Sequence, residues 1–140
     1  MDDCVFCKIV EGTLPSSKVY EDDTCLAFLD INPLTPGHTL IIPKRHCPDI
    51  TRACDEELAT VVRRIPVVAK AVVKATEAEG FSLVQLNGAA AGQVVFHLHF
   101  HIIPRKSGDG VSFHWQHRRY AAGEMDVLAQ KIRQCLKERS

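Results

Sequence analysis

Residues 96–104 read FHLHFHIIP, with histidines at positions 97, 99 and 101 that are each separated by one bulky apolar residue. Side chains two residues apart in an extended chain point to the same side of a sheet. We therefore expect a strand over residues 94–104 with its histidines on one face, roughly 7 Å apart. The opposite, core-packed face would carry Phe96, Leu98, Phe100 and Ile102. Pro104 lacks an N–H, so strand pairing is expected to end there.

The rest of the chain alternates between two periodicities, which predicts an α+β domain. Gly12 is expected to end a short helix in CVFCKIVEG. Gly80 is expected to end a long helix, which Pro66 should kink or locally loosen. The long helix is expected over residues 55–79, further strands over 18–21, 25–30, 38–42 and 81–88, and a last amphipathic helix over 125–136.

Composition limits the function classes. With 140 residues, of which 46% are hydrophobic, the chain is expected to form one domain over residues 1–140. Seventeen basic residues balance seventeen acidic ones, which argues against nucleic acid as a partner. We find neither an apolar run of about 20 residues nor a signal peptide, so we expect a cytoplasmic protein without membrane contact, its six cysteines reduced.

Three interpretations of the histidine strand follow from the residues alone. Alternating histidines can hold a catalytic zinc ion with an open position for water. A neutral imidazole can instead attack phosphorus if an acceptor holds its other nitrogen. The third interpretation is a set of structural histidines, although a structural strand has no need for a row of groups that each require a hydrogen-bond partner.

The stretch before the histidines favours phosphate. Asn87-Gly88 and Gly92-Gln93 place small residues where backbone N–H groups can approach a ligand, and two side-chain amides where they can donate to phosphoryl oxygens. A simple turn between two strands would also use Asn-Gly, so this signal alone leaves both interpretations open.

The sequence HLHFHII resembles the histidine triad pattern, and the chain is similar to the Hint branch of the histidine triad (HIT) superfamily and to bacterial HIT-like proteins. The stretches that carry the resemblance are CVFCKIVEG, VYEDDTCLAFLDINP, PGHTLIIPKRH and GQVVFHLHFHIIPR, which run from about residue 4 to residue 105. The resemblance implies a core over about 4–105 with an extension over 106–140. It also implies a five-stranded antiparallel sheet and a homodimer with a ten-stranded sheet.

The resemblance also implies a role for individual residues. His99 would be the nucleophile, His101 would donate to the phosphoryl group, and His38 and Gln93 would complete the catalytic set. Asp30 would accept the ribose hydroxyls. The remaining nucleotide-binding residues would be Asn87 at the phosphate and Phe6, Ile9, Phe28 and Leu40 around the base, although these four apolar residues have ordinary core packing as their alternative.

A second site is implied at the N-terminus. Cys4 and Cys7 form a C-x2-C pair that, by itself, fits either half of a zinc site or two buried thiols. His46 and His97 match the zinc ligands of the bacterial relatives, so the resemblance implies a closed Cys2His2 site with structural Zn²⁺. No organic cofactor is expected.

The function expected from the resemblance is hydrolysis of a purine nucleoside phosphoramidate at the α-phosphorus, through a nucleotidyl-histidine. Two alternatives are a dinucleoside polyphosphate hydrolase, because HIIPR is similar to the Fhit branch, and a nucleotide-binding interaction protein with little turnover. Val94 departs from the family pattern, since a serine or threonine usually follows the glutamine and assists the phosphate and the leaving amine.

Overall fold

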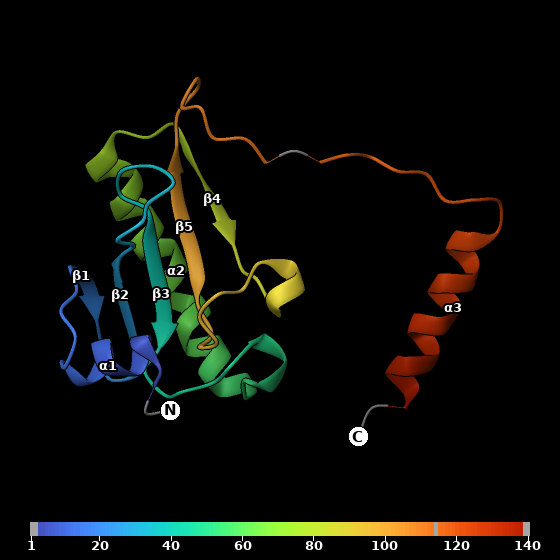
Figure 1. The fold of residues 1–140 in the computed structure, drawn as a ribbon, viewed down its shortest axis with the longest axis horizontal. Helices are drawn as coiled ribbons and strands as arrows, with labels where there is room; N and C mark the ends of the chain where they lie inside the picture. The colour runs from blue at the N-terminus through green and yellow to red at the C-terminus, as the bar shows by residue number, and fades with distance from the viewer. Residues whose placement is uncertain (1–2, 114, 139–140) are drawn as a thin grey trace.

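The computed structural model describes residues 3–113 and 115–138, which form an antiparallel sheet with a long helix across one face (Figure 1). In chain order the elements are α1 (Val5–Glu11), β1 (Lys18–Glu21), β2 (Cys25–Leu29), β3 (Thr39–Pro43), η1 (Ile50–Arg52), α2 (Asp55–Thr76), β4 (Gly80–Val84), η2 (Ala89–Ala91), β5 (Phe100–Arg105) and α3 (Glu124–Lys137). The five strands lie in the order β1-β2-β3-β5-β4, and all pairs are antiparallel. The predicted α+β class and five-stranded antiparallel sheet are confirmed.

The two faces of the sheet bury different clusters. On one face, Ile41, Phe100 and Ile102 pack with the apolar stripe of α2, whose buried residues are Val61, Ile65, Val68, Ala69 and Val72. On the other face, side chains of β2 and β3 pack with α1, in a cluster of Phe6, Ile9, Leu26, Phe28, Leu40 and Ile42. Each fully buried aliphatic or aromatic side chain contributes roughly 2 kcal/mol before conformational entropy is counted.

The histidine strand is shorter than its alternating pattern predicts. β5 begins only at Phe100, which lies opposite Ile41 of β3, and His97 and His99 precede it. The next position of β3 that could bond in this ladder is Pro43, which has no N–H to donate. The N–H of Leu98 donates to the carbonyl oxygen of Cys47 instead, at 2.6 Å. The predicted start of the strand at residue 94 is therefore wrong, because the partner strand runs out.

The face prediction holds for most positions. Leu98, Phe100 and Ile102 are buried in the cluster under α2, as the alternation predicts, whereas Phe96 is exposed. His101 lies opposite Leu40 of β3, which places its side chain on the α1 face. The histidine side of the segment is thus the side that α1 covers.

Pro104 does not end the pairing, contrary to expectation. It lies opposite Phe81 inside the ladder between β4 and β5, and pairing continues to Arg105 opposite Gly80. The carbonyl oxygen of Pro104 accepts a hydrogen bond from the Thr35 hydroxyl at 2.7 Å, on the side away from β4. Because the N and the C=O of a residue point the same way in an antiparallel strand, the missing N–H lies on that side too and costs the β4 ladder nothing.

The long helix ends earlier than predicted. Glu77, with a left-handed φ of 54°, follows the last helical residue Thr76, and Gly80 is the first residue of β4 rather than a helix stop. The helix is continuous through Pro66. Gly12 does end α1, in a left-handed conformation with φ 85°, as the sequence predicts.

The turn that introduces His38 requires a glycine. Gly37 has a φ of +93°, and a Cβ atom there would lie 2.5 Å from Cγ2 of Thr76 at the end of α2. Only glycine allows the turn and the helix end to approach this closely. The last turn of α2 therefore helps to fix the position at which His38 enters the sheet.

Candidate active site

The three triad histidines lie partly on β5 and partly before it, but all on the side of the sheet that α1 covers. His101 is on β5, and His97 and His99 lie on the extended segment before it. The ring centroids of His99 and His101 are 4.9 Å apart, and the edge of Phe6 from α1 meets the His99 ring at a centroid distance of 5.1 Å. The structure therefore brings His99 and His101 together beneath α1.

The hydrogen bond of His99 fixes which nitrogen is available for chemistry. Nδ1 of His99 lies 2.6 Å from the carbonyl oxygen of His97, and a carbonyl can only accept, so Nδ1 carries the proton. Nε2 of the neutral ring then carries a lone pair. Burial lowers the pKa of His99, which keeps the ring neutral near pH 7. This is the protonation state that a nucleophile needs.

His38 and His101 form a second ordered pair. The backbone N–H of Leu34 donates to Nδ1 of His38 at 3.1 Å, so the proton of a neutral His38 is on Nε2. Nε2 of His38 lies 2.9 Å from Nδ1 of His101 and donates to it. His101 consequently carries its own proton on Nε2, where it can be donated to a ligand. The backbone N–H of Leu34 thus fixes the tautomer of His38, and His38 in turn fixes the tautomer of His101.

Charge and burial keep this pair neutral. Burial, followed by the charges of His99 and His38, lowers the pKa of His101 to about 4. Burial also lowers the pKa of His38, against the opposing effect of the Asp30 carboxylate. That carboxylate lies 3.6 Å from Nε2 of His38, and its other oxygen accepts from the N–H of Asn32 at 2.8 Å. Asp30 is therefore at the same site as His38 and His101.

The four apolar residues predicted around a base are all buried in one cluster, with Phe6 and Phe28 in edge contact at a centroid distance of 5.4 Å. Their burial fits ordinary core packing, and contact with a base stays a prediction. The cluster does explain how α1 is held against the sheet, because Phe6 and Ile9 are the buried residues of that helix.

Gln93 and Asn87 hold loops together in this structure. The Gln93 amide donates to the carbonyl oxygens of Pro48 and Val95, at 2.7 and 3.1 Å, and its Oε1 accepts from the N–H of Gly88 at 2.8 Å. The Oδ1 of Asn87 accepts from the N–H of Ile50 at 2.9 Å. A contact of Gln93 with a phosphoryl group would require one of its bonds to be exchanged, and both predicted phosphate contacts stay predictions.

The predicted metal ligands converge. One side-chain atom from each of Cys4, Cys7, His46 and His97 lies within 4.8 Å of all the others. Nδ1 of His97 is 3.4 Å from the sulfur of Cys4 and 3.6 Å from that of Cys7, and Nδ1 of His46 is 3.4 Å from the Cys7 sulfur. A tetrahedral zinc ion with ordinary bond lengths separates its sulfur and nitrogen ligands by about 3.5 Å. These four residues could hold a metal ion.

The protonation of this cluster also fits a cation. Nε2 of His97 donates to the carbonyl oxygen of Pro43 at 2.8 Å, which leaves the lone pair on Nδ1, the nitrogen that faces the sulfurs. Burial lowers the pKa of His97 to about 4, so this lone pair is free near pH 7. Burial and the neighbouring Cys4 raise the pKa of Cys7 to about 11, and a bound cation would be needed to stabilise its thiolate.

Comparison with known proteins identifies the family. The family model described as HIT domain matches residues 11–108. The chain belongs to the HIT family. Adenylylsulfatase HINT3 from Arabidopsis thaliana is 46% identical to this HIT protein over 136 residues, which cover 97% of this chain and 68% of the relative. Adenosine 5'-monophosphoramidase hnt1 from Schizosaccharomyces pombe is 40% identical over 130 residues, with coverage of 92% and 95%.

Solved HIT structures share the fold. The crystal structure of SMU.412c from Streptococcus mutans UA159 has a TM-score of 0.93 and 43% identity, and the match covers 97% of this chain and 87% of that one. A Zn-bound histidine triad family protein from Mycobacterium smegmatis has a TM-score of 0.76 and 37% identity, with 99% of both chains covered. Among the described residues of this HIT protein, no helix has the length and hydropathy needed to cross a membrane.

Proposed function

We propose that this protein hydrolyses purine nucleoside phosphoramidates at the α-phosphorus through a nucleotidyl-His99 intermediate. The observation that carries the proposal is the bond from Nδ1 of His99 to the His97 carbonyl, because it leaves the lone pair on Nε2 beside the donor His101. Two relatives whose names specify an adenylyl group joined to sulfate or to an amine support a substrate of this class.

The reaction would proceed in two displacements. Nε2 of His99 forms a bond to the α-phosphorus while the P–N bond breaks, and the leaving amine takes up a proton from solvent. Water then attacks the same phosphorus and releases a proton to solvent, the bond to Nε2 breaks, and a nucleoside monophosphate leaves with neutral His99 restored. His101 donates from Nε2 to a phosphoryl oxygen, where negative charge develops. His38 acts through His101 by fixing its tautomer, and Asp30 would accept the ribose hydroxyls.

A metal ion has a separate role in this proposal. Zn²⁺ held by Cys4, Cys7, His46 and His97 would have four protein ligands and no open position, so it would stabilise the fold rather than activate water. The Zn-bound relative supports zinc as the ion. No organic cofactor is required for either displacement.

A metallohydrolase is the competing function. Asp30, His38 and His101 also bring ligand atoms within 4.8 Å of one another. However, the two histidine nitrogens are 2.9 Å apart, a hydrogen-bond distance, whereas nitrogens on a tetrahedral zinc ion are separated by about 3.3 Å. The geometry therefore favours a hydrogen-bonded pair, and a covalent adduct would distinguish the two reactions directly.

The proposal also includes the domain boundaries, the oligomeric state and the cellular location of the protein. The chain would be one domain with a core over about 4–105, and the family match over residues 11–108 supports that division. We also propose a homodimer in which β4, one of the two edge strands, pairs with its counterpart to give ten strands. A cytoplasmic location is supported by the cysteines, all six of which are free thiols.

The test is a rapid quench with adenosine 5′-phosphoramidate. The protein is stopped at alkaline pH within milliseconds and examined by intact-protein and peptide mass spectrometry. An adenylyl adduct on His99 that decays to AMP supports the proposal. Steady release of AMP without an adduct at any quench time, with activity lost in step with chelated metal, would instead support the metallohydrolase.

Val94 supplies a prediction about the leaving group. Its side chain is 85% exposed, so a serine is accommodated there without repacking. Val94→Ser is expected to raise kcat/KM for at least one phosphoramidate by roughly tenfold, because the added hydroxyl can donate to the leaving group. Val94→Ala is the matched control, since it removes the same side chain without adding a donor. An equal response of both variants across a panel of amines would contradict this role.

A further inference from the structure

Thr35 is a buried residue in a connection that is otherwise open to solvent. It lies between β2 and β3, where its neighbours Ile31 and Leu34 are 89% and 52% exposed. Apolar packing therefore does little to hold this connection in place. The hydroxyl of Thr35 donates to the carbonyl oxygen of Pro104 at 2.7 Å, and this bond ties the connection to β5.

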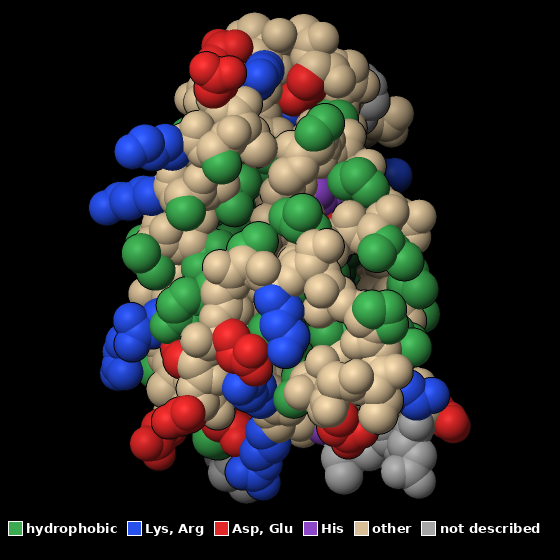
Figure 2. All heavy atoms as spheres, turned by 90° about the vertical axis from the view of Figure 1, so that its left-hand side faces the viewer, with side chains coloured by type: hydrophobic (Ala, Val, Ile, Leu, Met, Phe, Trp, Pro, Cys, Tyr) green, Lys and Arg blue, Asp and Glu red, His purple; other side chains and the backbone are tan. Residues whose placement is uncertain are grey.

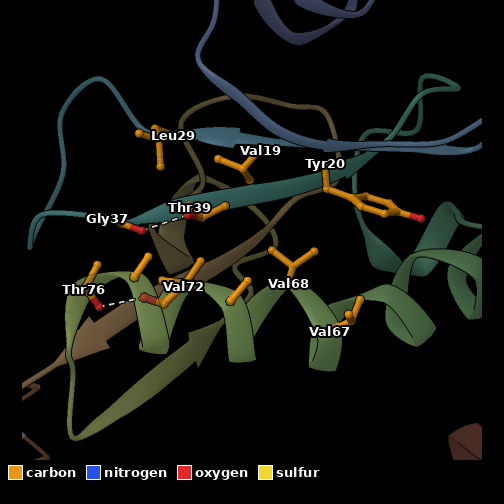
Figure 3. Close-up of a pocket in the computed structure, with 11 residues that line it drawn as sticks. Val19, Tyr20, Leu29, Gly37, Thr39, Val67, Val68, Val72 and Thr76 are labelled. Carbon is orange, nitrogen blue, oxygen red and sulfur yellow. Dashed lines mark hydrogen bonds between the residues drawn. The ribbon is translucent and has the colours of Figure 1, made fainter.

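The register of the sheet explains why Pro104 accepts this bond. The last pair of β3 and β5 is Thr39 opposite Ile102. The same register would place Gly37 opposite Pro104, but the chain turns at Gly37, whose φ is +93° (Figure 3). A buried carbonyl oxygen without a donor is costly. The Thr35 hydroxyl takes the place of the backbone donor that the turn removes.

Thr35 also opens the turn that leads into β3. The N–H of His38 donates to the carbonyl oxygen of Thr35 at 3.0 Å. Pro36 and Gly37 occupy the central positions, and a proline followed by a residue with positive φ is typical of a type II turn. The N–H of Leu34, directly before Thr35, donates to Nδ1 of His38 at 3.1 Å. The stretch that Thr35 anchors thus holds both the backbone and the ring of His38.

These bonds form a closed path that leaves β5 and returns to it. From Pro104 the path runs through Thr35 and its neighbour Leu34. It continues through the ring of His38 and returns at Nδ1 of His101, three residues before Pro104. His38 is 3% exposed, and only small areas of histidine side chain are visible on the face shown in Figure 2. Water therefore does not easily replace the N–H of Leu34 as the donor to His38.

We propose that Thr35 is a positioning residue that keeps His101 in its donor form, by fixing the tautomer of His38. The inference rests on the proposed function, in which His101 donates from Nε2 to a phosphoryl oxygen. If the N–H of Leu34 leaves Nδ1 of His38, that nitrogen can carry the proton instead. Nε2 of His38 then accepts from Nδ1 of His101, and Nε2 of His101 has a lone pair and no proton to donate.

The Asp30 carboxylate limits the size of this effect. One of its oxygens lies 3.6 Å from Nε2 of His38, and its negative charge favours a proton on that nitrogen. The N–H of Asp30 also donates to the carbonyl oxygen of His38 at 2.9 Å, which holds the backbone at the start of β3. Loss of the Thr35 anchor should therefore leave both tautomers populated, and activity should fall without being abolished.

Removal of the hydroxyl tests the role of Thr35. Thr35→Val keeps the shape of the side chain but has no donor for the carbonyl oxygen of Pro104. We expect it to lower kcat for adenosine 5′-phosphoramidate by roughly tenfold and to change KM less than about twofold, because the donor is affected and the binding surface is not. Thr35→Ser retains the hydroxyl and should keep the original kcat. Thr60→Val is the matched control, since it removes a hydroxyl that donates to the carbonyl oxygen of Glu57 on α2.

NMR of ¹⁵N-histidine-labelled protein measures the tautomers directly, with the His101 signals assigned by their loss in His101→Asn. His101 should carry its proton on Nε2 in the original protein, in Thr35→Ser and in Thr60→Val, and on both nitrogens in exchange in Thr35→Val. If Thr35→Val does not fold, Thr35→Ala makes the same comparison with Thr35→Ser.

Two results would overturn the proposal: a folded variant without the hydroxyl whose His101 is still protonated on Nε2 alone, or an equal loss of kcat in Thr35→Ser. The NMR measurement involves no turnover. A protein that shows the tautomer change but hydrolyses no phosphoramidate would therefore contradict the proposed function and leave the positioning role of Thr35 standing.

Discussion

His99→Asn is expected to lower kcat for adenosine 5′-phosphoramidate by roughly 10⁴-fold or more, since the variant has no ring nitrogen to attack phosphorus. In the structure His99 holds its proton on Nδ1 against the carbonyl of His97, and asparagine can still donate to that carbonyl while lacking a nucleophile. The loss should therefore appear in the chemical step and not in folding. Single-turnover kinetics, together with the thermal unfolding midpoint, measure both.

Two comparisons sharpen this prediction. His101→Asn should cost less, roughly 10²- to 10³-fold, because it removes a donor to the developing charge but leaves the nucleophile in place, and the adenylyl adduct should still be detectable. His99→Gly should regain part of its turnover with added imidazole, which would attack the α-phosphorus in place of the missing ring. A His99→Asn variant with more than about a tenth of the original rate would show that His99 is not the nucleophile.

The sequence predicts which side of the strand each residue faces better than it predicts where the strand begins. Alternation alone assigns Leu98, Phe100 and Ile102 to the helix-covered side, and these residues are buried there. The pattern cannot show that β5 begins at Phe100, because that boundary depends on the lack of an N–H at Pro43 of the neighbouring strand. The same applies to Pro104, whose effect depends on which side of β5 its nitrogen faces.

The sequence also does not predict which side chains donate hydrogen bonds to backbone carbonyl oxygens. The carbonyl oxygen of Pro43 fixes the tautomer of His97, and the carbonyl oxygen of Pro48 accepts a hydrogen bond that holds the side chain of Gln93 in place. Every residue has a carbonyl, so no residue type signals that one of them will accept a side-chain bond. The pairing of His38 with His101 requires two strand registers to be known together, although the sequence identified each histidine separately.

The position of α2 on the sheet illustrates the same limit. The three-and-four spacing of α2 predicts one buried stripe, and the structure confirms that Val68 and Val72 belong to it. Val67 lies beside that stripe and is exposed. It lines an apolar groove between α2 and β1, and the existence of this groove depends on where α2 packs on the sheet. Sequence patterns give the apolar face of a helix, but the place of the helix on the sheet comes from packing.

Loss of the metal is expected to have the largest effect on stability. Cys7→Ser should lower the thermal unfolding midpoint by about 10 °C or more, because structural zinc sites contribute several kcal/mol to folding and one ligand of four is removed. Metal analysis should find about one zinc ion per chain in the original protein and far less in the variant. Cys135→Ser is the matched control, since Cys135 is an exposed cysteine outside the cluster of four ligands.

The same variant separates a structural metal from a catalytic one. Below its unfolding midpoint, folded Cys7→Ser protein should still form the adenylyl adduct on His99, because the tautomer of the nucleophile is fixed by the Nδ1–H that it donates to the backbone carbonyl oxygen of His97 and not by the metal. Activity should then decline with temperature along the unfolding curve. If activity instead disappears with the metal while circular dichroism shows the chain folded, the ion takes part in the reaction. A Cys7→Ser midpoint equal to that of the control would show that these four residues hold no structural ion.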